Sequence, residues 1–112
     1  MQPKKIAQLV REAADAKQAV APIILDISRL SSIAHYFVIA HGNSDRHVRA
    51  IAQNIQDELG RNEVPVWHAE GTTDGRWIVL DYGDVIVHVF YRDLREFYGL
   101  ERLWGNAPQL KN

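Results

Sequence analysis

The chain has 112 residues, a net charge of −1 and no cysteine. Its length suits one domain with a single core, and its charge balance gives no reason to expect nucleic-acid or membrane binding. The lack of cysteine excludes disulfides and thiol chemistry. The sequence contains no signal peptide, and no apolar run approaches the roughly 20 residues of a membrane span. We therefore expect a cytoplasmic protein.

The first third of the chain predicts a helix followed by two strands. Residues 3–17 carry apolar side chains at three- and four-residue spacing, which is typical of an amphipathic helix. Residues 22–27 form a short, almost entirely apolar stretch that predicts a central strand. Asp26 is its one acid, and a structural role near the strand end is the simplest interpretation. A short loop leads to a second strand at 36–40, so the two strands are able to pair as an antiparallel hairpin.

The middle of the chain predicts a second helix and an edge strand. Ser44 is a good N-cap for a helix over 45–59, and Gly60 is expected to end it. Residues 64–68 read as a third strand, and Pro65 within it favours a position at the edge of the sheet.

The stretch 77–90 predicts two strands joined by a tight turn, and the rest of the chain is expected to be organised around it. Taking Tyr82 and Gly83 as the turn residues places Leu80 opposite Val85. One face of this hairpin is then purely aliphatic and suits the core. The other face is mixed, and it carries Trp77, Val79, Asp81, Asp84, Ile86, His88 and Phe90. This mixed face is either a docking surface or a second covered face, since sheets in mixed folds are often buried on both sides.

The C-terminal part predicts a short helix over 92–98, a break at Gly99 and one further turn. We expect residues 1–105 to form one domain and residues 106–112 to be a loosely held tail. The fold class is therefore α/β, with a mixed sheet of about five strands and helices packed on it.

Signals for catalysis or for a cofactor are weak. Residues 42–44 join a strand to a helix start, a place that suits phosphate and resembles the nucleotidyltransferase fold, although a simple capped helix explains it as well. Nucleotidyltransfer also needs paired carboxylates for magnesium, and residues 66–70 offer no such pair. His68 and Glu70 are too few ligands for zinc. We therefore expect no catalytic residues, no metal and no cofactor.

The acids at the hairpin turn favour a protein partner instead. Asp81 and Asp84 lie beside the aromatic Trp77 in the expected hairpin. Aromatic anchors ringed by charge are typical of interface hot spots, and an acidic tip suits a basic protein. The hypothesis is an interaction surface formed by the mixed face.

Three motifs, taken together, resemble the ribosomal silencing factor family, also called RsfS or Iojap. They are Trp-x-x-x-Asp-Tyr-Gly-Asp at 77–84, Val-His-Val-Phe at 87–90 and Phe-Tyr-x-Leu-Glu-x-Leu-Trp at 97–104. Together with matches at 25–27 and 36–44, the resemblance covers nearly the whole domain.

The resemblance implies a nucleotidyltransferase-like topology without its catalysis. It also implies binding to the large ribosomal subunit through ribosomal protein L fourteen, which blocks subunit joining and represses translation when nutrients are scarce. A homodimer of the free protein is implied as well. The alternative is a divergent nucleotidyltransferase-like nucleotide-binding protein.

The residues expected at the partner follow from matching the motifs and adding the neighbouring acidic loop. They are Glu70, Trp77, Asp81, Tyr82, Asp84, His88, Arg95, Tyr98 and Glu101. An aromatic stripe at helical spacing is more often core than contact, so Tyr98 is also a candidate for a fold-supporting residue.

Overall fold

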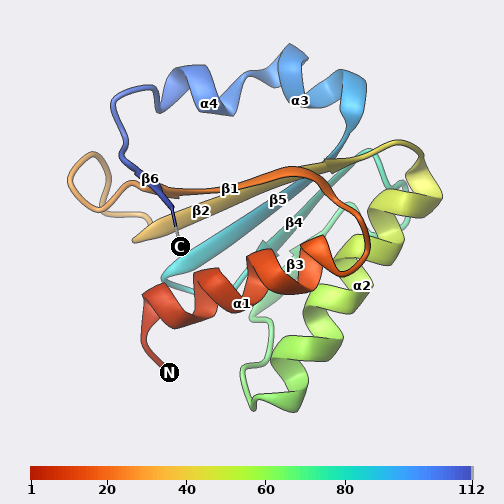
Figure 1. Cartoon of the computed structure of the whole chain (residues 1–112), viewed down its shortest axis with the longest axis horizontal. Helices are drawn as coiled ribbons and strands as arrows, with labels where there is room; N and C mark the ends of the chain where they lie inside the picture. Colours follow the sequence, from red (N-terminus) through yellow and green to blue (C-terminus); the bar gives the residue numbers. More distant parts are fainter. Residues whose placement is uncertain (112) are drawn as a thin grey trace.

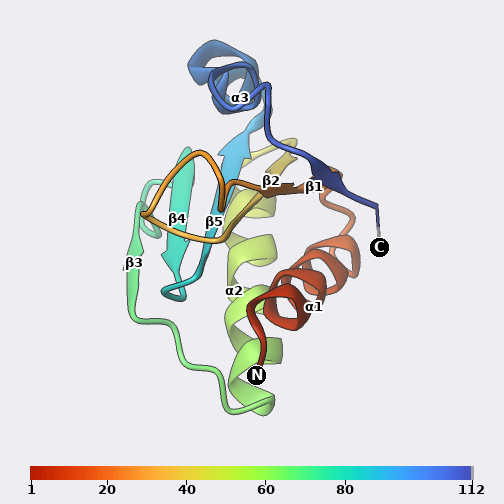
Figure 2. The ribbon, with the colours of Figure 1, turned by 90° about the vertical axis from the view of Figure 1, so that its left-hand side faces the viewer.

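The computed structural model describes residues 1–111 as a six-stranded sheet with helices on both faces (Figure 1). The elements are α1 (Pro3–Asp15), β1 (Val20–Asp26), β2 (Tyr36–Gly42), α2 (Asp45–Arg61), β3 (His68–Glu70), β4 (Trp77–Asp81), β5 (Val85–Tyr91), α3 (Arg92–Tyr98), α4 (Leu100–Leu103) and β6 (Gln109–Leu110). Figure 2 shows α1 and α2 on one side of the sheet and α3 on the other. The predicted α/β class is confirmed. None of the helices in residues 1–111 is long and apolar enough to cross a membrane.

The sheet is mixed, with strand order β3-β4-β5-β2-β1-β6. Among the strands of residues 1–111, only β2 and β5 pair in parallel, while β1 and β2 form the predicted antiparallel hairpin. β3 lies at an edge as predicted, but it spans His68–Glu70, so Pro65 lies outside it and only His68 of the predicted strand 64–68 belongs to it. Asp26 ends β1, and its carboxylate accepts hydrogen bonds from the backbone N–H and hydroxyl of Ser28. These bonds, the hydroxyl's first, lower the pKa of Asp26, so the structural interpretation is confirmed.

The last residues add a strand that the sequence did not predict. Gln109 and Leu110 form β6 on the free edge of β1, and the Asp26 N–H donates to the Pro108 carbonyl over 2.8 Å. The described part of the expected loose tail is therefore attached to the sheet, because β1 offers unpaired backbone groups there. Asn112 lies outside the described residues.

The register of the central hairpin differs from the prediction by two residues. Leu80 pairs with Val87, and Gly83 and Asp84 rather than Tyr82 and Gly83 form the turn. Gly83 has φ of +87°, which only glycine adopts easily at the first turn position. A shift of two leaves every side chain on its predicted face, because side chains alternate with a period of two.

The second helix begins where predicted and ends later. The Ser44 hydroxyl accepts from the His47 N–H over 3.0 Å, which confirms the N-cap. Gly60 does not end the helix, which continues to Arg61 with Asn62 as its C-cap. Its last carbonyls find donors without a left-handed glycine, since Val64 N–H donates to the Leu59 carbonyl.

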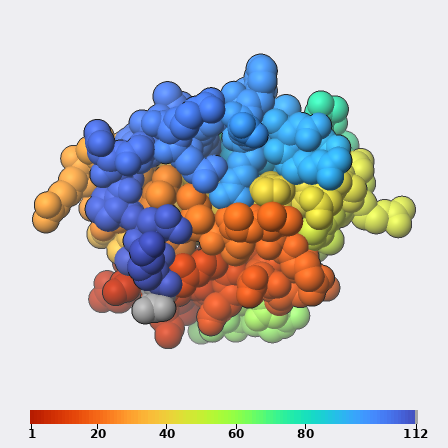
Figure 3. Space-filling view, turned by 45° about the horizontal axis from the view of Figure 1, so that its top comes forward, coloured from red at the N-terminus to blue at the C-terminus, as the bar shows by residue number. Residues whose placement is uncertain are grey.

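Two cores lie on opposite faces of the sheet. The larger one packs the aliphatic hairpin face against α1 and α2, and we call this side of the sheet the main-core face. The smaller one lies on the other side of the sheet, beneath α3 and α4. We call these two helices the cap, and the side of the sheet that they cover the cap face. Figure 3 shows the C-terminal residues, coloured blue, as a continuous layer across the upper part of the molecule. This second core decides which part of the cap face meets solvent.

Candidate partner-binding face

The mixed face of the hairpin is partly covered and partly open. Strand pairing puts side chains from β3, β4, β5 and β2 on the cap face. Leu94 and Leu100 of the cap, with Trp104 directly after α4, pack over Phe37 and Phe90 in the centre of the sheet. Towards the β3 edge the cover ends, which leaves a patch that we call the open strip. It consists of Glu70, Trp77, Val79, Asp81 and Ile86. The mixed face is therefore covered at its centre and open towards the β3 edge, and docking at the open part stays a prediction.

Trp77 is the residue of the open strip that lies next to the cap. Its ring stacks on Phe90 at 5.0 Å and lies 4.6 Å from the ring of Tyr98, centroid to centroid. Tyr98 is 43% exposed, and its neighbour Phe97 is 74% exposed. Aromatic side chains from a strand and from the cap thus meet at one side of the open strip, and part of each Trp77 and Tyr98 ring reaches solvent.

His88 lies beneath Trp77 and is only 7% exposed. Its Nδ1 accepts a hydrogen bond from the Trp77 indole N–H over 3.2 Å. The Phe37 ring lies edge-on at 4.8 Å. Burial among these rings lowers the pKa of His88 to about 4, because a charged imidazolium loses its hydration there. His88 is therefore a neutral interior residue and presents no surface to a partner.

The two acids at the hairpin turn, Asp81 and Asp84, differ in hydrogen bonding and in exposure. The Asp81 carboxylate accepts from the Gly83 N–H over 2.7 Å and so stabilises the turn while staying half-exposed. The Asp84 side chain is exposed. Tyr82 points to the main-core face, where burial raises its pKa to about 12. Two carboxylates thus lie at the tip of the hairpin, and the phenol between them in sequence is inside the protein.

Arg95 is also an interior residue, 8% exposed, and it attaches the cap to the sheet. Its Nε and Nη2 donate to the Glu101 carboxylate over 2.9 and 3.2 Å. Its Nη1 donates to the Val20 carbonyl and to His41 Nδ1, both at 3.0 Å, and Nη2 donates to the Ala21 carbonyl at 2.9 Å. Every guanidinium donor is used inside the chain, so Arg95 and Glu101 hold the cap rather than face the open strip.

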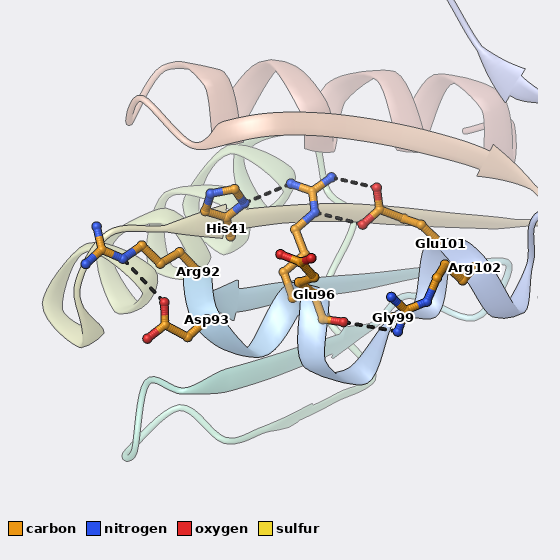
Figure 4. Close-up of a pocket in the computed structure, with 8 residues that line it drawn as sticks. His41, Arg92, Asp93, Glu96, Gly99, Glu101 and Arg102 are labelled. Carbon is orange, nitrogen blue, oxygen red and sulfur yellow. Dashed lines mark hydrogen bonds and ion pairs between the residues drawn. The ribbon is translucent and has the colours of Figure 1, made fainter.

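The hollow beside Arg95 has a volume of about 540 Å³ and balanced charges. Three arginines and three acids border it, namely Arg92, Arg95, Arg102, Asp93, Glu96 and Glu101. His41 also lines it, and its pKa is lowered by burial first and by the charge of Arg95 second. In Figure 4 the Glu101 carboxylate faces a guanidinium and the Asp93 carboxylate faces Arg92. This balance favours no class of charged ligand.

The start of α2 does not resemble a working phosphate site. The N–H of Asn43 donates to His47 Nδ1, and the N–H of His47 donates to Ser44. Two of the amides that an anion would use are therefore already bonded within the chain. Within residues 1–111 no group of three or more His, Asp or Glu side chains is placed to hold a metal ion. His68 and Glu70 contact each other at 2.9 Å, both exposed.

The structure separates the expected contact residues into two sets. Glu70, Asp84 and Tyr98 are exposed, and Trp77 and Asp81 are half-buried, all near the open strip. Tyr82, His88 and Arg95 instead lie inside the protein, and the half-buried Glu101 pairs with Arg95. Interior and surface positions share these residue types, so only packing distinguishes them.

Some surface residues were not predicted as contacts. Val79 and Ile86 supply apolar area on the open strip; the alternation of the hairpin placed them on the mixed face, but they are not among the predicted contact residues. Trp67 is 75% exposed and lies against Gly83 at the turn. Its exposure depends on tertiary packing, and no sequence pattern indicated it.

Comparisons with known proteins agree with the resemblance. The family model described as ribosomal silencing factor during starvation matches residues 1–112. Ribosomal silencing factor RsfS of Bacillus subtilis is 45% identical over 108 residues, covering 96% of this chain and 92% of that protein. The chloroplastic protein Iojap of Zea mays is 31% identical, covering 89% of this chain and 43% of that protein.

Solved structures share the whole fold. A crystal structure of a protein from Chromobacterium violaceum has a TM-score of 0.91 and 36% identity, covering 94% of this chain and 88% of that one. A crystal structure from Bacillus halodurans has a TM-score of 0.86 and 35% identity, covering 97% and 99%. The arrangement of strands and helices described above is thus shared with both relatives.

Proposed function

Because the chain belongs to the ribosomal silencing factor family, we propose that it binds the large ribosomal subunit through ribosomal protein L fourteen. Bound there, it blocks joining of the small subunit and represses translation under nutrient limitation. It acts in the cytoplasm by occupying a surface rather than by catalysis, and it is a homodimer when free. The family description, which refers to silencing during starvation, supports this direction of regulation.

The open strip is the observation that carries the proposal. The half-buried apolar side chains of Trp77, Val79 and Ile86 lie on the cap face at the edge of the cap, and α3 contacts Trp77 through Tyr98. The acids Glu70 and Asp84 lie close to them on the β3 edge and the turn. An apolar centre with a charged rim is the usual composition of a protein interface, and acids at the rim select a basic partner.

The contacts divide by role. Trp77 and Tyr98 act as anchors that lose water on binding, which makes them the residues with the largest expected effect. Glu70, Asp81 and Asp84 meet lysine and arginine side chains of the partner and speed association. Arg95 and Glu101 act indirectly, by holding the cap on which Tyr98 is carried.

Co-sedimentation with isolated large subunits tests the proposal. Wild type is expected to pellet with the subunit, Trp77→Ala to remain largely in the supernatant, and Asp84→Lys to bind more weakly, most clearly at low salt. Asp57→Lys is the matched control, because Asp57 is exposed on α2, on the opposite side of the sheet. Calorimetry with purified ribosomal protein L fourteen then identifies the direct partner.

Two outcomes contradict different parts of the proposal. Wild type that stays in the supernatant rejects ribosome binding for this chain. Wild type, Trp77→Ala and Asp84→Lys that pellet equally well retain ribosome binding but reject the open strip as the contact surface. Addition of small subunits to the wild-type complex, followed by gradient sedimentation, tests the block of subunit joining separately.

A further inference from the structure

The Trp77 indole has one atom able to form a conventional hydrogen bond, and that atom points into the protein. Its Nε1–H donates to His88 Nδ1 over 3.2 Å. His88 is buried, and its ring is itself held by Phe37 at 4.8 Å and Phe90 at 6.2 Å. The orientation of the indole is therefore set from below by a rigid acceptor rather than by solvent.

Core packing alone does not explain a histidine at this position. Since Nδ1 accepts, the proton of the neutral ring is on Nε2, and that nitrogen has no partner within residues 1–111. A buried unpaired N–H costs roughly 1–3 kcal/mol, which a leucine or phenylalanine would avoid. The feature that histidine adds over an apolar residue is the acceptor beneath Trp77. Its lowered pKa keeps that lone pair available at neutral pH.

The inward N–H determines what Trp77 can offer outside. Once Nε1 is bonded to His88, only ring carbons remain for a partner. The ring also lies against Phe90 and Tyr98, which restricts rotation about its side-chain bonds. A carbon surface of fixed orientation suits an apolar side chain or a cation lying on the ring, and it does not suit a hydrogen-bond acceptor.

We propose that His88 is a positioning residue for binding, which fixes the Trp77 indole with its N–H inward so that the partner meets ring carbons through an apolar or cationic side chain. This inference rests on the proposed function and adds the chemistry of the partner group that lies on Trp77. His88 affects binding by orienting Trp77, and its imidazole does not contact the partner.

Nuclear magnetic resonance of the indole N–H groups tests the positioning directly. With 15N-labelled tryptophan the Trp77 signal is assigned by its loss in Trp77→Phe. It is expected to exchange with water at least about ten-fold more slowly than the signal of exposed Trp67. His88→Leu removes the acceptor and should abolish this protection. His88→Asn, whose side-chain oxygen is able to replace Nδ1, should retain most of it.

Binding to large subunits, measured for the same variants, tests the consequence. We expect His88→Leu to weaken binding about ten-fold through lost orientation, and His88→Asn to stay within about two-fold of wild type. Trp77→Phe removes the same hydrogen bond but keeps an aromatic ring at this position, so it should weaken binding about as much as His88→Leu, whereas Trp77→Ala loses most binding. A general folding defect would lower all His88 variants alike, so rescue by asparagine separates positioning from structural damage.

The outcomes are separable. Wild type that fails to bind overturns the proposed function, and the inference with it. Wild type that binds, with His88→Leu equally tight, overturns the inference alone. Trp77→Phe as weak as Trp77→Ala also overturns it, because the partner then needs the indole N–H. If His88→Leu does not fold, the exchange rate in wild type and the Trp77→Phe binding still decide the question.

Discussion

Lowering the pH from 7 to 5 is expected to destabilise the protein through His88. Burial lowers the pKa of His88 to about 4 in the folded state, against about 6.5 in the unfolded chain. Between these values the unfolded chain binds the proton and the folded protein does not. Stability is therefore fully present above pH 6.5 and declines as the pH falls toward 4.

The size of the effect follows from the two pKa values. The full difference of about 2.5 units corresponds to about 3 kcal/mol, of which about 2 kcal/mol is already lost at pH 5. Because only 7% of His88 is exposed, solvent screening does not reduce this figure much. His41 contributes with the same sign, since burial, followed by the charge of Arg95, also lowers its pKa. Asp26, whose pKa is lowered from 3.8, matters only at more acidic pH.

Urea unfolding followed by circular dichroism at pH 7 and pH 5 measures the effect. The decrease in unfolding free energy should be about 2 kcal/mol smaller in His88→Leu than in wild type. His68→Gln, which changes an exposed histidine on β3, should show the wild-type decrease. Equal decreases in wild type and His88→Leu would refute a buried neutral His88, and with it the basis for a permanently available acceptor beneath Trp77.

Four further changes test the fold. Arg95→Met should lower the unfolding free energy by about 3 kcal/mol in urea titrations, because it leaves the carbonyls and the carboxylate beneath the cap without their donor. Gly83→Ala should lower the free energy of unfolding by about 1–2 kcal/mol, since φ is +87° and the new Cβ would meet the Trp67 ring at 2.8 Å. Gly60→Ala, in a helix with open space around it, should instead raise that free energy by about 0.5–1 kcal/mol in the same titrations. Ser44→Ala removes the N-cap of α2 and should cost about 1 kcal/mol, with unchanged ribosome binding as the check that this site is structural.

Local signals in the sequence predicted most of the secondary structure. Apolar spacing placed both long helices, and the alternation of residues 77–90 assigned each hairpin side chain to its face. These assignments were reliable because they depend on periods of 3.6 and 2 residues, which neighbouring residues determine. The hairpin register was less certain, since Gly83 with a positive φ fits either the first or the second turn position.

The sequence by itself therefore determined the family, most of the elements and the face of each hairpin residue. Only the tertiary structure decided which of those residues meet solvent. The cap covers the centre of the sheet and ends short of β3, so Val79 and Ile86 stay half-open while His88 and Arg95 are enclosed. The physical reason is that exposure depends on what other segments pack against a side chain, and contacts such as that of Arg95 with the Val20 carbonyl join residues far apart in the chain.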